Sequence, residues 1–200
     1  MTKEERRRWD ERYSTGSYQP RPAASPFLES WITRLPVGRS LDLACGAGRN
    51  ALRLAEAGQR VDAVDISSAG VEMARAEAAR RGLDVTWVVA DLDTFQLETA
   101  AYDLITVIRY ANPELWPRVA ESLAPNGWLL VEHHMQTERD VLGPTDSRFR
   151  LQPQELLDAF SSLRIIFYEE AIEPADHPAD CGQGMYAVVR LVACNGDPGF

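Results

Sequence analysis

Residues 39–67, RSLDLACGAGRNALRLAEAGQRVDAVDIS, restrict the possible folds of this chain more than any other stretch. A short apolar strand pattern leads into two glycines, Gly46 and Gly48, and these are followed by a predicted helix and by a second apolar strand that ends at Asp65. A strand, a crossover helix and a second strand form a βαβ unit with parallel strands. The stretch therefore predicts the beginning of a parallel sheet, with a glycine loop where the first strand turns into its helix.

Strand and helix patterns continue to alternate along most of the chain. The predicted strands lie at 40–44, 60–64, 85–89, 102–108 and 127–134. The predicted helices between them lie at 49–57, 68–81 and 113–125. Repeated units with apolar strands are typical of a doubly wound α/β fold, a mostly parallel sheet with helices on both faces.

The two ends of the chain depart from this alternation. Two helices are predicted before the first strand, one through Tyr13 and one at 25–35 with Ser25 as its N-cap. After a short predicted helix at 152–160, strands at 163–172 and 185–193 are joined by a segment too polar and too rich in proline and glycine for a crossover helix. We expect these last two strands to pair antiparallel.

Composition limits the class of protein. The 200 residues, 45% of them hydrophobic, suit one globular domain over residues 1–200. The net charge of −9 repels phosphate backbones, so we expect no nucleic-acid partner. The three cysteines, Cys45, Cys181 and Cys194, have neither the number nor the spacing of a disulfide framework or a zinc site, and we expect no bound metal. No stretch resembles a signal peptide or a membrane span, which predicts a cytoplasmic protein.

The glycine loop and Asp65 predict a nucleotide-binding crevice. Gly46 and Gly48 permit positive φ and a close approach of a ligand to the main chain, and the next helix begins with free N–H groups. Asp65 ends the neighbouring strand, where a carboxylate can accept hydrogen bonds from both hydroxyls of a ribose. GAGRNA at 46–51 even satisfies the loose dinucleotide pattern, so two kinds of cofactor fit this arrangement.

Three features argue against a nicotinamide dinucleotide. Asp42 stands inside the first strand, where a dinucleotide fold usually has an apolar residue. Asp91 and Leu92 follow the third strand and are well placed to bracket an adenine. The expected antiparallel pair at the end of the sheet is the third feature.

Four segments in order resemble the successive motifs of class I S-adenosylmethionine-dependent methyltransferases. They are LDLACGAGRNALRLAEAGQRVDAVDIS, ADLDTF, YDLITVIRY and LAPNGWLLVEHH. The resemblance covers about residues 25–192 and implies a seven-stranded sheet whose last strand is inserted antiparallel. It also implies which residues hold S-adenosylmethionine. Asp42, Gly46 and Gly48 hold the methionyl end, Asp65 the ribose, Asp91 and Leu92 the adenine, and Ile66 the other face of the adenine.

Two more residues complete the implied cofactor site. Ala44 replaces the first glycine of the family's usual triplet, and Ile108 ends the fourth strand beside the crevice. The opening RRRWDERY and the short chain resemble tellurite-resistance and thiopurine-type small-molecule methyltransferases. This second resemblance implies a small-molecule acceptor.

The methyl acceptor is expected beyond the carboxyl ends of the fourth and fifth strands, since ligands of open α/β sheets bind there. Arg109 and Tyr110 follow the fourth strand, where Arg109 either anchors an anionic substrate or pairs with a neighbouring acid. His133 and His134 end the fifth strand and face opposite sides, so at most one of them points at the methyl group. A histidine here would have a pKa suited to a general base. The alternative is a histidine that bonds loop backbone.

Two pairs of residues are candidates for substrate binding or for a lid. Arg148 and Arg150 either bind an oxyanion together or lie on the solvated surface. Trp9 and Tyr13 share one face of the first helix, so residues 1–35 either close over the cofactor as a lid or simply pack on the domain.

The sequence thus predicts a methyltransferase that uses S-adenosylmethionine and acts on a small molecule by direct in-line displacement. A protein or RNA methyltransferase and a non-catalytic cofactor-binding subunit are the alternatives. The oligomeric state and the acceptor atom are not determined by these patterns.

Overall fold

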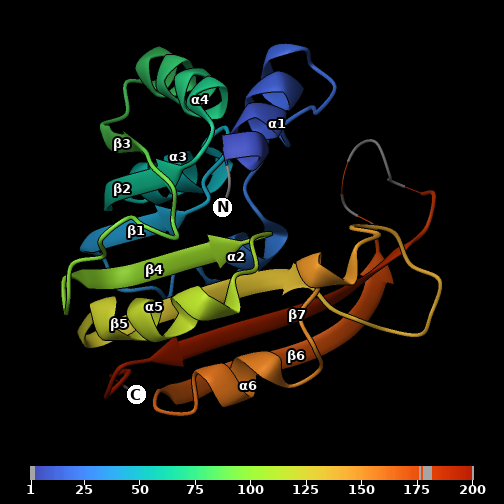
Figure 1. Ribbon diagram of the computed structural model, residues 1–200. Helices are drawn as coiled ribbons and strands as arrows, with labels where there is room; N and C mark the ends of the chain where they lie inside the picture. The colour runs from blue at the N-terminus through green and yellow to red at the C-terminus, as the bar shows by residue number, and fades with distance from the viewer. Residues whose placement is uncertain (1–2, 176, 178–181, 200) are drawn as a thin grey trace.

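A computed structural model describes residues 3–175, 177 and 182–199, and Cys181 lies outside this part of the chain. Its seven strands form one sheet in the order β3-β2-β1-β4-β5-β7-β6 (Figure 1). Every neighbouring pair is parallel except that β7 runs antiparallel to both β5 and β6. The strands are β1 (Arg39–Leu43), β2 (Arg60–Asp65), β3 (Val85–Val89), β4 (Tyr102–Ile108), β5 (Leu123–His134), β6 (Arg164–Pro174) and β7 (Met185–Cys194). The predicted doubly wound sheet with an inserted antiparallel strand is confirmed.

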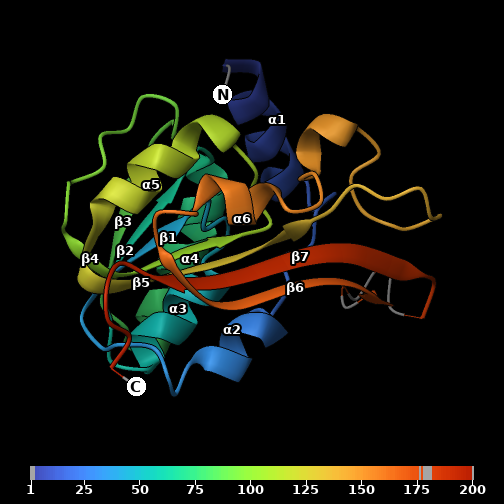
Figure 2. The ribbon, with the colours of Figure 1, turned by 90° about the horizontal axis from the view of Figure 1, so that it is seen from below.

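Helices cover both faces of the sheet. Helices α2 and α3 lie on one face, and α5 and α6 lie on the other (Figure 2). Helix α4 packs on α3 and on β3, and α1 packs on α4 above the end of the sheet (Figure 1). The helices are α1 (Lys3–Ser14), α2 (Pro26–Trp31), α3 (Arg49–Glu56), α4 (Ser68–Arg81), α5 (Trp116–Ser122) and α6 (Glu155–Ala159), with short 3-10 turns at Pro113–Leu115 and Ser147–Phe149.

Alternation along the strands separates two apolar layers. Leu41 and Leu43 of β1 pack with the layer that includes Trp116 of α5 and Phe160 after α6. Since neighbouring strand residues face opposite sides, Asp42 points to the α2 and α3 face, where Leu54 and other apolar residues form the second layer. The fold thus buries a carboxyl group under the beginning of α3.

Helix ends follow the capping signals in the sequence. Ser25 caps α2, its hydroxyl accepting a hydrogen bond from the Phe27 amide. Gly82 ends α4 in the left-handed conformation that glycine favours. Asn112 accepts a hydrogen bond from the Glu114 amide at the start of the Pro113–Leu115 turn.

The region between α5 and β5 departs from the prediction. The helix expected at 113–125 ends at Ser122, and β5 begins at Leu123 instead of residue 127. Pro125 is incompatible with a helix interior, because it lacks the N–H and its ring collides with the preceding turn. The first residues of β5 are paired through an irregular register with β4 between Tyr102 and Leu104.

Gly127 sits at this irregularity with no room for a side chain. A Cβ there would lie 2.6 Å from the carbonyl oxygen of Tyr102 and 2.9 Å from that of Ala124, and both are backbone atoms. We expect Gly127→Ala to lower the free energy of unfolding by about 1–3 kcal/mol in urea denaturation, because the sheet must shift. Gly184→Ala is the matched control, since a Cβ there meets only the movable Leu142 side chain. Equal losses in the two variants would contradict this account of the register shift.

Candidate active site

The glycine loop after β1 forms the floor of the candidate site. Ala44, Gly46 and Gly48 have φ values of +56°, +55° and +81°, in the left-handed region. A Cβ on Gly48 would lie 2.6 Å from the Trp87 ring and 2.8 Å from Ala74, so glycine is required there for space as well as for conformation. Ala44 adopts the same kind of backbone with a Cβ, which costs about 1 kcal/mol. The predicted loop is therefore present, with Ala44 as its strained member.

Asp65 reaches back from the end of β2 to this loop. Its carboxylate accepts hydrogen bonds from the Gly46 amide at 2.7 Å and from the Ser67 amide at 2.8 Å. Burial raises its pKa, and the two amide donors partly oppose that change. The Asp65 carboxylate thus connects the glycine loop to the start of α4.

Asp42 is the second buried carboxyl group of the site. It is 1% exposed, and its Oδ1 atom accepts a hydrogen bond from the Thr106 hydroxyl at 2.7 Å. Its Oδ2 atom is buried without a hydrogen-bond partner. Burial raises the pKa of this carboxyl to about 7. A buried acceptor left unpaired is costly, so a cationic donor such as the ammonium group of a methionine fits beside it.

The remaining cofactor candidates lie along the edges of β2, β3 and β4. Ile66 and Ile108 are 3% and 5% exposed, and Ile108 belongs to the α2 and α3 layer. Asp91 is half-buried, and its carboxylate accepts a hydrogen bond from the Asp93 amide. The Leu92 side chain is 1% exposed and packs in the opposite layer, so an adenine here would meet its backbone.

Tyr110 is partly buried two residues after the end of β4. Its hydroxyl accepts a hydrogen bond from the Asn112 side chain at 3.4 Å. Burial raises its pKa, and the nearby acids Asp91 and Asp65 act in the same direction. It is therefore a neutral wall of the crevice that can donate a hydrogen bond.

Helix α1 is fastened over the crevice by a residue that sequence reasoning missed. The Oδ1 atom of Asp10 accepts hydrogen bonds from the Ser67 hydroxyl, the Ser68 hydroxyl and the Ala69 amide at 2.8–3.2 Å. These donors lie at the N-terminus of α4, where a carboxylate is favoured. Nothing in the sequence relates Asp10 to residues more than fifty positions away, so only the fold identifies this contact.

Two aromatic residues of α1 point toward the glycine loop and Tyr18. The rings of Trp9 and Tyr13 lie 6.0 Å apart, as their spacing on one helix face predicts, and each also contacts Tyr18. The Tyr13 hydroxyl lies where a Cβ on Gly46 would be, and its ring lies against Gly70. Burial raises the pKa of Tyr13, and the charge of Asp65 adds to the effect.

Arg109 leaves β4 toward the other side of the site. It has a φ of +63°, and its Nη1 atom lies 3.3–3.4 Å from the ring nitrogens of His134. Its Nε atom forms an ion pair with Glu132 at 3.4 Å, and its guanidinium lies over the Tyr186 ring at 5.2 Å. Both readings of Arg109 from the sequence therefore stay open, because it pairs with an acid and also borders the expected acceptor position.

The two histidines face opposite sides of β5, as predicted. The Nε2 atom of His133 lies 2.9 Å from the Phe149 carbonyl, whereas His134 packs edge-on against Tyr186. Burial, with a smaller effect of the Arg109 charge, lowers the pKa of His133 to about 4 and that of His134 to about 2. The expectation of a pKa suited to a general base is thus corrected, since both rings are neutral and weakly basic at pH 7.

The loop after β5 contains Arg148 and Arg150, which do not act together. Arg148 is a surface residue in an ion pair with Asp146 at 2.7 Å. Arg150 donates hydrogen bonds to the carbonyls of Pro144, Met135 and Leu142 and so holds the loop in shape. Of the two readings from the sequence, this geometry favours structure and surface over a shared oxyanion site.

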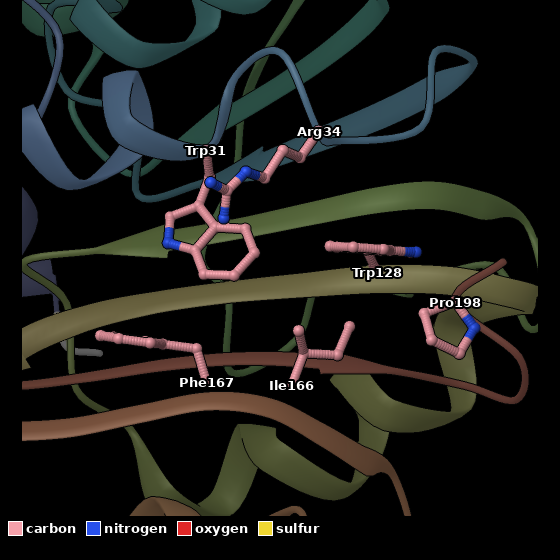
Figure 3. Close-up of a pocket in the computed structure, with 6 residues that line it drawn as sticks. All are labelled: Trp31, Arg34, Trp128, Ile166, Phe167 and Pro198. Atoms are coloured by element: carbon pink, nitrogen blue, oxygen red, sulfur yellow. The ribbon is translucent and has the colours of Figure 1, made fainter. Parts of the chain in front are cut away.

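A separate apolar groove lies far from this site. Figure 3 shows Trp31, Trp128 and Phe167 gathered between α2 and the β5–β6 part of the sheet, in a groove of about 580 Å³. Trp128 precedes His134 by six residues of one strand, which is roughly 20 Å. Within the described part of the chain, no three His, Cys, Asp or Glu side chains are grouped to hold a metal ion, and no helix is long and apolar enough to cross a bilayer.

Comparisons with known proteins agree with this geometry. Residues 41–127 match a family model described as a methyltransferase domain. The chain is 36% identical over 67 residues to ubiquinone biosynthesis O-methyltransferase of Methylocella silvestris, which is 34% of this chain and 26% of the relative. It is 32% identical over 141 residues to hemagglutinin 1 of Eikenella corrodens, which is 67% of this chain and 46% of that protein. The chain thus spans between about a quarter and a half of these curated relatives.

The fold also matches that of solved structures. The crystal structure of TehB from Haemophilus influenzae has a TM-score of 0.74 and 19% sequence identity, over 93% of this chain and 66% of that chain. Residues 41–127 thus match the methyltransferase domain family, and the chain as a whole has the fold of that crystal structure. The cofactor of this family is S-adenosylmethionine.

The raised pKa of Asp42 predicts how stability changes with pH. A carboxyl whose pKa is higher in the folded state than in the unfolded chain favours folding below pH 4, and this contribution is lost as the pH rises through about 7. Ligand-free Asp42→Asn should therefore gain stability over the natural protein between pH 5 and pH 8, by up to about 4 kcal/mol. Urea unfolding at several pH values measures the difference in the free energy of unfolding between the variant and the natural protein. Both histidines contribute equally to the two proteins, so their contributions cancel. Parallel stability curves would contradict the burial of a carboxyl at this position.

Proposed function

We propose that this chain transfers a methyl group from S-adenosylmethionine to a small-molecule acceptor. The observation that carries the proposal is the buried, unpartnered Oδ2 atom of Asp42 beneath a glycine loop of the methyltransferase family. The cofactor's ammonium group would give this atom the partner that the protein does not supply. Asp65, at the end of β2, would exchange the Gly46 amide for the hydroxyls of the ribose.

Each part of the site has a task in this reaction. Bound S-adenosylmethionine supplies a methyl group on a positively charged sulfur, which makes the methyl carbon electrophilic. Asp42 and Asp65 fix the two ends of the donor's ribose–methionine unit, and Asp91 with the Leu92 backbone borders the adenine. Tyr110 and Arg109 line the path from which an acceptor approaches in line with the breaking bond. Rate enhancement then comes mainly from position and orientation.

A strong general base is not part of this proposal. Both histidines have lowered pKa values, so neither takes a proton readily. An acceptor that ionises by itself, such as a thiol or an acidic phenol, fits this site better than an amine or an alcohol. We expect kcat/KM to change with pH as the acceptor itself ionises. We expect His134→Gln to lower kcat/KM less than tenfold. A hundredfold loss of kcat/KM in His134→Gln, together with the loss of an inflection near pH 6.5 in its pH profile, would instead show that a histidine acts as the general base.

A small acceptor is favoured over a macromolecular one. One matching relative is named as a ubiquinone biosynthesis O-methyltransferase, and the net charge of −9 disfavours RNA. Among the described cysteines, Cys45 and Cys194 are free thiols, which agrees with action in the reducing cytoplasm. A non-catalytic cofactor-binding subunit is the second candidate, because a neutral pair of histidines at the acceptor side supplies no obvious chemistry.

Cofactor binding is the direct test of the donor site. Isothermal titration with S-adenosylhomocysteine should give micromolar binding, whereas NADH should give none. Asp65→Ala should weaken S-adenosylhomocysteine binding more than tenfold, or at least ~1.4 kcal/mol. Asp84→Ala is the control, because Asp84 is exposed ahead of β3. A thiol, phenol and amine screen then separates an enzyme from a subunit that binds the cofactor without turnover.

We further propose that, of residues 1–35, the α1 part acts as a lid over the donor, with Trp9 and Tyr13 on its inner face, while α2 packs in the core. Three hydrogen bonds that Asp10 accepts from the start of α4 fasten this lid, and Tyr13 fills space next to Gly46. Asp10→Ala should therefore speed the dissociation of S-adenosylhomocysteine at least fivefold in stopped-flow fluorescence. Glu11→Ala, on the exposed side of α1, is the matched control. Identical rates in both variants would show that α1 only packs on the domain.

A further inference from the structure

Arginine side chains converge between the start of α3 and the ends of β4 and β5. Arg49 is the first residue of α3, and its Nη1 atom donates a hydrogen bond to the Ala23 carbonyl at 3.4 Å. Two residues later, the Ser25 hydroxyl donates a hydrogen bond to Glu132 at 3.3 Å, and Glu132 in turn pairs with Arg109. Arg49 and Arg109 are thus linked through residues 23–25 and Glu132, and each lies close enough to the other for its charge to act on it.

Holding these cations together is unfavourable in the structure as it stands. Burial lowers the pKa of Arg49, and the positive charges of Arg21 and Arg109 act in the same direction, while the charge of Glu132 opposes them. Among the described residues, Arg49 forms no ion pair within 4 Å, and its one hydrogen bond goes to a neutral carbonyl. Burial and like charges both penalise a guanidinium, and a bound anion would relieve both penalties.

The nearby acids Glu132, Glu169 and Glu173 already form ion pairs with other arginines. Glu132 is 1% exposed and is shared between Arg109 and Arg190, with Arg190 at 2.9 Å. Arg190 also pairs with Glu169 and Glu173 on the β6 side. Glu132 therefore holds the Arg109 guanidinium in place from β5, while the Tyr186 ring supports its face. This arrangement fixes the direction of Arg109 and makes Glu132 a positioning residue.

We propose that Arg49 and Arg109 bind an anionic group of the methyl acceptor, so that the substrate is a small molecule with a carboxylate or another oxyanion near its nucleophilic atom. This inference rests on the proposed function, because the anion would be part of a methyl acceptor only if the protein is a methyltransferase. Guanidinium groups are suited to this task, because they bind planar oxyanions with two parallel hydrogen bonds.

The same chemistry could serve the carboxylate of the cofactor's methionine. Arg49 directly follows Gly48 and therefore lies between the two parts of the site, whereas the sheet order places Arg109 on the acceptor side. Arg109 contacts groups on β5 and β7, which are two and three strands away from β1. At the usual spacing between strands this is about 10–14 Å from the glycine loop's own strand. That places the Arg109 guanidinium on the side where an acceptor enters, while the donor's acids lie over β1 and β2.

The test measures anion binding and cofactor binding separately. Benzoate is titrated into the full-length protein with and without saturating S-adenosylhomocysteine, and benzamide serves as the neutral isostere. The variants are Arg109→Gln and Arg49→Gln, with Arg80→Gln as the control, because Arg80 is exposed on α4 and pairs only with Glu77 among the described residues. We expect benzoate but not benzamide to bind, and both site variants to weaken benzoate binding at least tenfold. Their affinity for S-adenosylhomocysteine should change less than threefold, which also shows that they fold.

The contrary outcomes are distinct. Benzoate affinity that is equal in all variants, or absent from the natural protein, overturns the anion site. If the arginine variants lose S-adenosylhomocysteine affinity but keep their affinity for 5′-methylthioadenosine, which lacks the methionyl carboxylate, the arginines belong to the donor and the acceptor assignment fails. Benzoate binding through both arginines, without any binding of S-adenosylhomocysteine, would keep the anion site and overturn the methyltransferase proposal instead.

Discussion

The buried carboxylates at the ends of β1 and β2 are the constraint on which this structure depends. Asp65 satisfies its oxygens on two backbone amides, and one of them belongs to a glycine with positive φ. Asp42, one strand away, keeps an oxygen without a partner. Such a pair is expensive for a ligand-free protein, since each carboxyl has a raised pKa. A ligand that supplies a cation and two hydroxyls would pair with both carboxylates, and this pairing would favour its binding.

Charges of opposite sign divide the two halves of the site. Acids lie over β1 and β2, where a sulfonium donor carries positive charge. Arg109 and Arg190 lie toward β4, β5 and β7, where both pair with Glu132 and Arg109 also lies over the Tyr186 ring, while Arg49 lies between the two halves at the start of α3. A cationic donor and an anionic acceptor attract each other across such a site, and their reaction reduces the charge on the donor. The mixed sheet matters here, because antiparallel β7 brings Arg190 and Tyr186 beside β5.

The fold was largely predictable from the sequence, because its signals are local. Apolar runs and the capping residues Ser25, Gly82 and Asn112 decide where strands and helices begin and end. Strand β4, for example, was predicted at its observed bounds. The main error, at the end of α5, arises where Pro125 and a register irregularity override a helical pattern. The donor loop was predictable for the same reason, since its residues lie within a single βαβ unit.

The acceptor side was predictable only in part, because its properties come from distant contacts. Sequence position alone suggested histidines with ordinary pKa values, whereas burial and Arg109 make both of them weakly basic. The role of Glu132 depends on β7 being inserted beside β5, and the Asp10 contact depends on where α1 docks. No sequence motif indicates either contact, because each joins segments that are far apart along the chain.

A crystal structure with S-adenosylhomocysteine bound tests the central claim most directly. The account predicts that the ligand's ribose replaces the Gly46 amide as a partner of Asp65, that its ammonium group lies within hydrogen-bond distance of the Asp42 Oδ2 atom, and that the Tyr13 hydroxyl has moved from its place over Gly46. An electron density map in which Asp65 keeps both amide bonds and the ligand lies elsewhere would contradict it.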